Sequence, residues 1–295
     1  MAVAEMTPDV GAPPQGRRLR RLWENVSIIF RSRVAVIGLA IVLFWVLVAT
    51  FAPLIAPHDP LAQDSSAINQ GPSQQYPLGT DNLGRDILSR LIFGSRTILI
   101  LAPLSVLASV IAGTLLGLTG GYFGGLTDEV VMRILDAIMA FPTILLYLII
   151  IAAIGPSAVN VVIAITFVGA PGVARLVRSL TLDIRTRDYI RAAETRGEHP
   201  LYIMFVEILP NARGPLIIDA MLRVGYAIFA IGTLGFLGLG LPPPTPDWGG
   251  MISEARKYIW SNPLGVLWPA IAISSLVVGL NLFADGLREE STRYQ

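Results

Sequence analysis

The chain has 295 residues, of which 53% are hydrophobic and 15% are charged, and its formal net charge is +1. Soluble domains carry about 25% charged residues, so this composition excludes an ordinary water-soluble protein and indicates a chain that lies mostly in lipid. There is no cysteine, and the two histidines, His58 and His199, are far apart in the sequence. Disulfides and Cys-ligated zinc are therefore excluded, and no metal site is expected.

The first segments predict a tail, an interfacial helix and a membrane span. Residues 1–16 contain three prolines and no apolar periodicity, which predicts a disordered tail. Within residues 17–56, an arginine-rich amphipathic stretch favours a helix lying in the inner membrane interface over a solvated basic tail. An uncharged run over 34–55 follows, and it is long enough to cross a bilayer.

Residues 57–94 are expected to form an external loop that ends in an amphipathic helix. The stretch PHDPLAQDSSAINQGPSQQYPLGT is rich in turn-forming residues. After it, Leu83, Ile87, Leu88 and Leu91 fall on one helical face. We interpret this segment, and the proline-rich PPPTPDWGG further along, as structural elements rather than as substrate contacts.

Residues 95–288 are expected to form a core of five further membrane helices, followed by a cytoplasmic tail over 289–295. No charge occurs from 137 to 174, a length of about 57 Å as a helix, which is too long for one crossing. The turn-forming Gly155-Pro156-Ser157 divides this stretch into two spans. The five spans lie near 97–118, 134–154, 158–177, 215–241 and 263–287.

Charge asymmetry predicts the orientation of the six spans. If the amino terminus lies in the cytoplasm, most of the 22 basic residues fall on the cytoplasmic side. Inner loops of membrane proteins carry this excess of arginine and lysine. The prediction is therefore an all-α integral membrane protein with six transmembrane helices and both termini in the cytoplasm.

The most charged block, RDYIRAAETRGEHPLYIMFVEILPNARGP, begins at residue 187 and lies in a predicted cytoplasmic loop over 183–213. A helical pattern stops at Gly197, a good helix breaker, and Pro200 suits the first turn of a second helix. Apolar residues at helical spacing continue to Ile208, and that second helix is expected to end before Pro210. Two short helices with an apolar stripe flanked by charge are typical of a contact site, although an ordinary amphipathic loop has the same composition.

The spacing within this block resembles the EAA motif of permease subunits in ABC importers, where it forms the docking element for an ATPase. Ala192-Ala193, three residues, Gly197, nine residues and then Glu207-Ile208-Leu209-Pro210 meet the spacing of the motif throughout. Arg191 replaces the first glutamate, and Glu207 stands where isoleucine is usual. The resemblance implies a coupling loop whose docking residues are Arg191, Ala192, Ala193, Glu194, Gly197, Pro200, Leu201, Phe205, Leu209 and Pro210.

Three further stretches, 76–99, 128–146 and 235–259, resemble the peptide/nickel group of these importers, in particular the second permease subunit of oligopeptide and dipeptide systems. The resemblance implies the permease fold of type I ABC importers in the inner membrane of a prokaryote. It also implies three kinds of partner: a homologous second permease subunit, two cytoplasmic ATPase subunits that bind ATP and Mg²⁺, and an extracytoplasmic substrate-binding protein. A nickel or oligosaccharide permease is the alternative within this group.

Nucleotide hydrolysis by the chain itself is considered first, and then two rival classes of function, a stand-alone secondary transporter and a membrane enzyme. A phosphate-binding loop needs a lysine beside its glycines, and the only lysine, Lys257, is not in such a loop, so the chain is not expected to hydrolyse nucleotides. A stand-alone secondary transporter would place ionisable residues near the membrane midplane. A membrane enzyme would need a polar catalytic cluster, for which neither histidine has an evident partner. No nucleic-acid partner is expected.

The pathway itself is less visible in the sequence. Gly232, Gly235 and Gly238 form a stripe of small residues in the fifth span, which favours helix packing over pore lining. Asp219 and Arg223 are one helical turn apart near the expected inner end of that span. We interpret them as a structural i, i+4 ion pair rather than as a substrate ligand.

Overall fold

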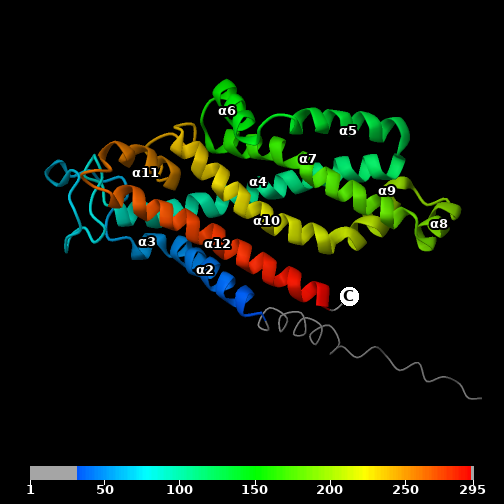
Figure 1. Ribbon diagram of the computed structural model, residues 1–295, viewed down its shortest axis with the longest axis horizontal. Coiled ribbons are helices and arrows are strands. Elements are labelled where there is room, and N and C mark those ends of the chain that lie inside the picture. The colour runs from blue at the N-terminus through cyan, green and yellow to red at the C-terminus, as the bar shows by residue number, and fades with distance from the viewer. Residues whose placement is uncertain (1–31, 294–295) are drawn as a thin grey trace, which may run out of the picture.

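The computed structural model describes residues 32–293 as an elongated bundle of long helices, in which the described residues form no β-strand (Figure 1). The predicted disordered tail over 1–16 and most of the interfacial helix fall outside the described residues. An all-α membrane protein is confirmed: five helices are long and apolar enough to cross a membrane, or six if one bent pair counts as a single span. The helices are α2 (Arg33–Thr50), α3 (Ala52–Ile55), α4 (Ile87–Phe123), α5 (Gly125–Met139), α6 (Thr143–Ile154), α7 (Ala158–Arg185), α8 (Asp188–Thr195), α9 (Pro200–Tyr202), the π-helical η2 (Ile203–Ile208), α10 (Leu209–Phe236), α11 (Trp248–Ala255) and α12 (Leu264–Arg293).

The second span is longer than predicted, because the expected amphipathic helix is not a separate element. A single helix, α4, begins after the N-cap Asp86, whose side chain accepts a hydrogen bond from the Ser89 amide, and it runs unbroken to Phe123. The prediction placed the start of this span near 97 because the uncharged run begins at Thr97. In the fold Arg90 is buried against carboxylates, so its charge does not mark the end of the buried helix.

The third span is not one straight helix. The helical conformation is interrupted between α5 and α6, and the two helices meet at 90°. Proline disfavours helical conformation in the residue before it, and here Pro142 follows Phe141 at the break. Bidentate hydrogen bonds from Arg178 to Asp128, both 2.5 Å, tie α5 to α7, whereas in α6 only Ile151 is buried. The expected continuous span over 134–154 is therefore wrong.

Small residues set the closest helix contacts in the bundle. Gly113, Gly117 and Gly121 of α4 lie against Val173–Thr181 of α7, and a Cβ added at any of the three would meet α7 atoms at less than 3.0 Å. Likewise, Gly38 of α2 lies against the backbone of Gly279 in α12. Such small-residue seams let membrane helices approach backbone to backbone, and they hold α4 to α7 and α2 to α12.

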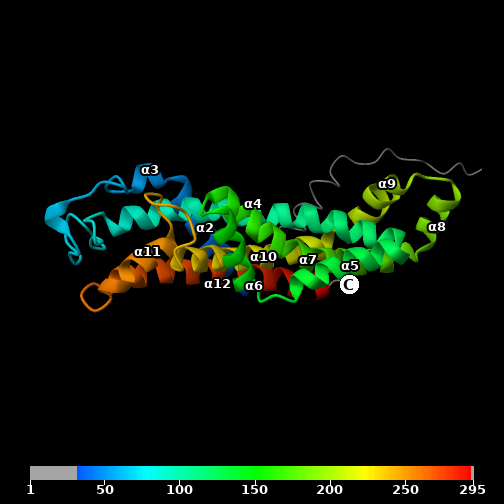
Figure 2. The same ribbon diagram turned by 90° about the horizontal axis from the view of Figure 1, so that it is seen from above.

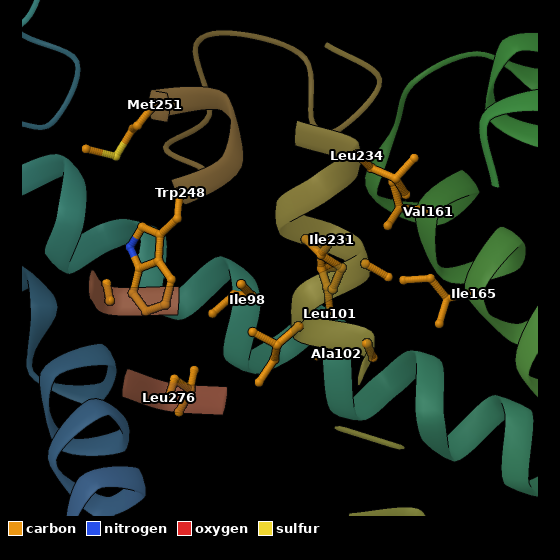
Figure 3. Close-up of a cluster of buried hydrophobic side chains, with 14 of the residues drawn as sticks. Ile98, Leu101, Ala102, Val161, Ile165, Ile231, Leu234, Trp248, Met251 and Leu276 are labelled. Carbon is orange, nitrogen blue, oxygen red and sulfur yellow. The ribbon is translucent and has the colours of Figure 1, made fainter. Parts of the chain in front are cut away.

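The largest buried cluster lies where α4, α7, α10, α11 and α12 converge (Figure 3). Trp248 at the start of α11 is fully buried, and its indole N–H donates to the Leu91 carbonyl oxygen over 2.9 Å. Its ring also packs edge-on against Trp45 of α2, with 4.8 Å between the ring centroids. Trp248 therefore fastens α11 onto the bundle, which supports the structural interpretation of PPPTPDWGG.

The loops gather at opposite ends of the bundle. In both views α8 and α9 lie at one end, whereas α11 and the long loop before α4 lie at the other (Figures 1 and 2). We refer to residues 57–86 and 242–263 together as the loop cap. The coupling loop and the loop cap are thus separated by the full length of the bundle.

Candidate functional site

The predicted coupling loop consists of α8, a tight turn, and the helical stretch that begins at Pro200. Gly197 has φ +76° and ends α8. Its amide donates to the Glu194 carbonyl oxygen, and the next amide, of Glu198, donates to the Ala193 carbonyl oxygen. This pair of bonds is a Schellman motif, which favours glycine at the left-handed position. The imidazole Nδ1 of His199 then accepts from the Leu201 amide and caps the next helix.

The inward face of the loop is packed onto the bundle. Ile190 and Ala193 of α8, with Ile203 and Ile208 of η2, are fully buried in a cluster that includes side chains of α4, α7 and α10. Burial of each of the three isoleucine side chains contributes about 1.5–3 kcal/mol. The loop is therefore held to the membrane helices as a packed unit, so a force applied to it is transmitted to them.

The outward face carries exposed apolar side chains. Leu201, Tyr202, Phe205 and Val206 are between 40% and 54% exposed, although they lie on a helical stretch whose other side is buried. We call these four residues the docking face. An exposed apolar group of this kind at the end of a rigid element is a candidate for a protein contact.

The ten residues predicted for docking differ in where they point. Ala193 is fully buried against the bundle, so the two alanines of the motif face opposite ways. Pro200 and Leu209 are half-buried. The other seven are exposed: Arg191, Ala192, Glu194, Gly197, Leu201, Phe205 and Pro210. The motif pattern did not single out Tyr202 and Val206, which complete the docking face.

The second helix of the loop was predicted to end before Pro210, but it does not end there. It continues from Pro200 to Phe236 as one long helix. The turn at η2 is widened, and the Leu209 amide donates to Met204, five residues back. A π-helical turn of this kind absorbs an irregularity in the bonding ladder, here just before Pro210, which has no amide hydrogen. The docking face is therefore continuous with a membrane-spanning helix.

The glycines predicted as a stripe in the fifth span have different surroundings. Gly232 packs against Ile273 of α12, and Gly235 packs against Asp247 and Gly250 beside α11. Gly238 lies beyond the helix, at φ +79°, in a second Schellman turn, so it is not part of a helical stripe. Gly232 and Gly235 let neighbouring residues pack closely against α10, and Gly238 ends this helix.

Asp219 and Arg223 form the predicted i, i+4 ion pair, with Nε and Oδ2 separated by 2.5 Å. The helix that carries them begins at Pro200 rather than near 215, so both residues lie near the middle of this helix. Arg223 lines a cavity of about 450 Å³ between α4, the α5–α6 bend, α7 and α10. Ser109, Tyr147 and Gly172 also line this cavity, and none of the three was among the predicted site residues.

At the other end of the bundle, the loop cap holds a buried ionic network. Asp81 and Glu254 accept hydrogen bonds from both Arg85 and Arg90. Both arginine side chains are less than 5% exposed. Because the two carboxylates come from the loop before α4 and from α11, the network joins the two halves of the loop cap.

Asp247 of the loop cap gives a testable pH dependence. Its Oδ2 accepts from the Gly250 amide as the N-cap of α11, its Oδ1 has no partner among the described residues, and burial raises its pKa to about 6. Folding therefore favours the protonated form, and stability falls as the pH rises from about 4 through 6. Asp247→Asn, which stays neutral, is expected to raise the free energy of unfolding by about 3 kcal/mol at pH 7.5 and to lose that gain near pH 4, as measured by thermal unfolding in detergent.

Asp64 provides the opposite sign as a control. Hydrogen bonds from the Ser66 hydroxyl and amide hold the pKa of Asp64 below its usual range. Its charged form is therefore the favoured one, and Asp64→Asn is expected to lower stability at pH 7.5. A gain in both variants would show that carboxylate charge in general, rather than burial at Asp247, limits the stability of the loop cap.

Among the described residues, no group of three or more histidine, aspartate or glutamate side chains is placed to hold a metal ion. The fold and the coupling loop together define the class of the protein, a membrane-spanning subunit of a transporter. Residues 109–289 match the family described as "Binding-protein-dependent transport system inner membrane component". Residues 21–72 match "N-terminal TM domain of oligopeptide transport permease C". The chain belongs to the family of inner membrane components of binding-protein-dependent transport systems, and it is a transport subunit rather than a catalytic one.

Relatives align along almost the whole chain. The chain is 40% identical over 287 residues to the dipeptide transport system permease protein DppC of Alkalihalophilus pseudofirmus, which covers 96% of this chain and 94% of the relative. It is 40% identical to the di/tripeptide transport system permease protein DppC of Pseudomonas aeruginosa, covering 92% and 90%. It is also 38% identical to the glutathione transport system permease protein GsiD of Pectobacterium atrosepticum, covering 92% and 89%.

Proposed function

We propose that this chain is one of two permease subunits of an ATP-driven importer for di- or oligopeptides, with both termini in the cytoplasm. It forms half of the translocation pathway beside a homologous second permease subunit. Two cytoplasmic ATPase subunits bind ATP and Mg²⁺, and an extracytoplasmic binding protein delivers the substrate. The observation that carries this proposal is the docking face, which is exposed, apolar and continuous with the membrane helix α10.

In this proposal the energy of ATP binding reaches the pathway through the coupling loop. The inward face of the loop packs against α4 and α7, so displacement of the loop moves these helices with it. ATP can drive such a change only by binding one global state of the transporter better than the other. The packed cluster beneath the docking face supplies the mechanical continuity that this linkage requires.

The peptide substrate is supported by the relatives, whose names specify dipeptides, di- and tripeptides, and the tripeptide glutathione. Nickel or another small solute is the alternative within the same transporter class. A stand-alone secondary transporter is the alternative outside it.

The assembled transporter in proteoliposomes tests all three possibilities. We expect uptake of a labelled dipeptide that requires internal ATP and the loaded binding protein. Uptake of Ni²⁺ but not of dipeptide would replace the substrate. Uptake by this chain without ATPase subunits would replace the class.

The docking face gives a direct test of the ATPase contact. Leu201→Ser removes an apolar side chain that is 54% exposed, and it is expected to weaken binding of the ATPase subunits about tenfold, because one buried leucine is worth about 1.5–3 kcal/mol. Leu61→Ser, at a leucine that is 41% exposed in the loop cap, is the matched control. The measurement is the affinity of the purified ATPase for permease in nanodiscs. Equal affinities for the two variants would remove the docking face from the contact.

A further inference from the structure

The cavity that Arg223 lines is large enough for a small ligand and holds several polar groups. Its volume of about 450 Å³ lies within the range of about 300–1,000 Å³ typical of ligand sites. Most of its wall is apolar, but Ser109, Tyr147 and Thr233 contribute hydroxyl groups, and Arg223 contributes the positive charge. An apolar cavity with a few fixed polar groups is the usual form of a small-molecule site.

The Arg223 guanidinium is held in place by its own helix and by α7. Nε donates to Asp219, and Nη1 donates to the Gly169 carbonyl oxygen over 3.4 Å. A Cβ on Gly172 would lie 2.9 Å from Nη2 and 3.0 Å from Nη1, so the absence of a side chain at Gly172 leaves room for the guanidinium. Arginine has five N–H donors, and those two are its only hydrogen bonds within the described part of the chain, so the fork retains free donors at the cavity wall.

If the outer end of α10 marks the outer boundary of the hydrocarbon layer, Arg223 lies inside that layer. Phe236, at the outer end of α10, is 13 residues further along the same helix, about 20 Å at 1.5 Å per residue, against a hydrocarbon thickness of about 30 Å. Gly172 lies at a similar depth, 14 residues after the outer end of α7 at Ala158. Charged side chains at such depth face protein or a water-filled path, and they mark substrate routes.

We propose that Arg223 binds the terminal carboxylate of a peptide in transit through the cavity, and that Asp219 and Gly172 position its guanidinium. This inference rests on the proposed peptide function. Arginine binds a carboxylate by paired charge-assisted hydrogen bonds, which are short and strong. The ion pair with Asp219 uses Nε, and the Gly169 carbonyl oxygen takes one Nη1 hydrogen, so the remaining Nη hydrogens are available to a carboxylate.

The same chemistry has a second possible source, a carboxylate side chain of the second permease subunit, and the test separates the two. The assembled permease–ATPase complex is purified without the binding protein, whose own selectivity would mask the effect. Equilibrium dialysis then measures its affinity for the labelled dipeptide Ala-Phe and for the C-terminal amide Ala-Phe-NH₂. We expect the free acid to bind about tenfold more tightly than the amide, because the amide lacks the charge that Arg223 recognises.

Arg223→Gln is expected to abolish the preference for the free acid, and Arg223→Lys is expected to retain part of it. Gly172→Ala displaces the guanidinium without removing its charge and is expected to reduce the preference, whereas Gly214→Ala, on the same helix as Arg223 with no atom within 4 Å of its Cβ, is expected to preserve it. Copurification of each variant with its partner subunits shows that it has folded.

Three outcomes would overturn the proposal: no binding of either peptide by the wild-type complex, equal binding of acid and amide, or a preference that survives Arg223→Gln. If Arg223→Gln weakens acid and amide binding equally, the arginine serves as a clamp between α7 and α10 or pairs with the second subunit. Failure of the proposed function is seen separately, as wild-type proteoliposomes that import no dipeptide in the presence of ATP and the loaded binding protein.

Discussion

Gly197→Asp is expected to reduce peptide uptake at least tenfold while the assembled transporter still hydrolyses ATP. Gly197 is exposed, and a Cβ built on it has no atom within 4 Å, so the substitution causes no collision inside the chain. Its cost to folding is the left-handed backbone at φ +76°, about 1–3 kcal/mol for a residue other than glycine. The larger effect falls on the contact with the ATPase, where the new side chain adds bulk and charge between α8 and the docking face. The measurements are ATPase activity and dipeptide uptake in the same proteoliposomes.

Gly238→Asp is the matched control for backbone strain. Gly238 has φ +79°, ends α10 in the same type of turn, and also has no atom within 4 Å of its Cβ, but it lies at the opposite end of the helix from the coupling loop. We expect this variant to retain the stimulation of ATPase activity by the loaded binding protein, which Gly197→Asp loses. If stimulation is unchanged in Gly197→Asp, the docking assignment is wrong. If both variants fail alike, strain rather than docking explains the loss.

The sequence was sufficient to predict those elements that local composition determines. The uncharged run over 34–55 became α2, and Gly155-Pro156-Ser157 does separate two helices, α6 and α7. Gly197 was expected to end a helix and does so, because the left-handed turn is a local property of the backbone. Pro200 was likewise expected in the first turn of the next helix, where proline fits without losing a hydrogen bond.

Elements that depend on distant partners could not be predicted in the same way. The start of the uncharged run suggested a boundary near Thr97, but α4 extends back to Ile87. It buries Arg90, which pairs with Asp81 and with Glu254, 164 residues away in the sequence. Pro210 suggested a helix end, yet the π-helical turn before it lets the helix continue. The bend precedes Pro142, a local signal that the sequence reading did not use, because it divided the uncharged stretch only at Gly155-Pro156-Ser157.

In the candidate site, too, features set by local sequence were predicted and features set by packing were not. The spacing of Ala192, Ala193 and Gly197 indicated a candidate coupling loop, but it did not indicate that Ala193 faces the bundle and Ala192 faces outward. The cavity was not predicted, because Tyr147, Gly172 and Arg223 come from three helices that only the packing brings together. Arg223 was recognised as half of an ion pair, but not as part of a cavity wall.

Asp81→Ala is expected to lower the free energy of unfolding by about 3–5 kcal/mol, the cost of removing one partner from a buried ionic network. Asp81 accepts side-chain hydrogen bonds from Arg85 and Arg90, and its Oδ1 also accepts from the amides of Leu83 and Arg85, over 2.8 and 2.9 Å. Its loss leaves two buried arginines to share Glu254 and removes the bonds that shape the turn before α4.

Asp81→Asn separates the two contributions, because its amide oxygen can still accept from the two backbone N–H groups while the charge is lost. Thermal unfolding in detergent is expected to rank the wild type as most stable, then Asp81→Asn, then Asp81→Ala. Asp59→Ala is the control and is expected to cost about 1 kcal/mol or less. Asp59 is an exposed aspartate in the same loop, and among the described residues its side chain accepts only from the Leu61 amide. A loss at Asp81→Ala no larger than at Asp59→Ala would mean that water reaches the two arginines and solvates them once the carboxylate is gone. The loop cap would then be held to the bundle by Trp248, by apolar contacts and by hydrogen bonds such as those of Thr97 with Pro246 and of His58 with Ser89.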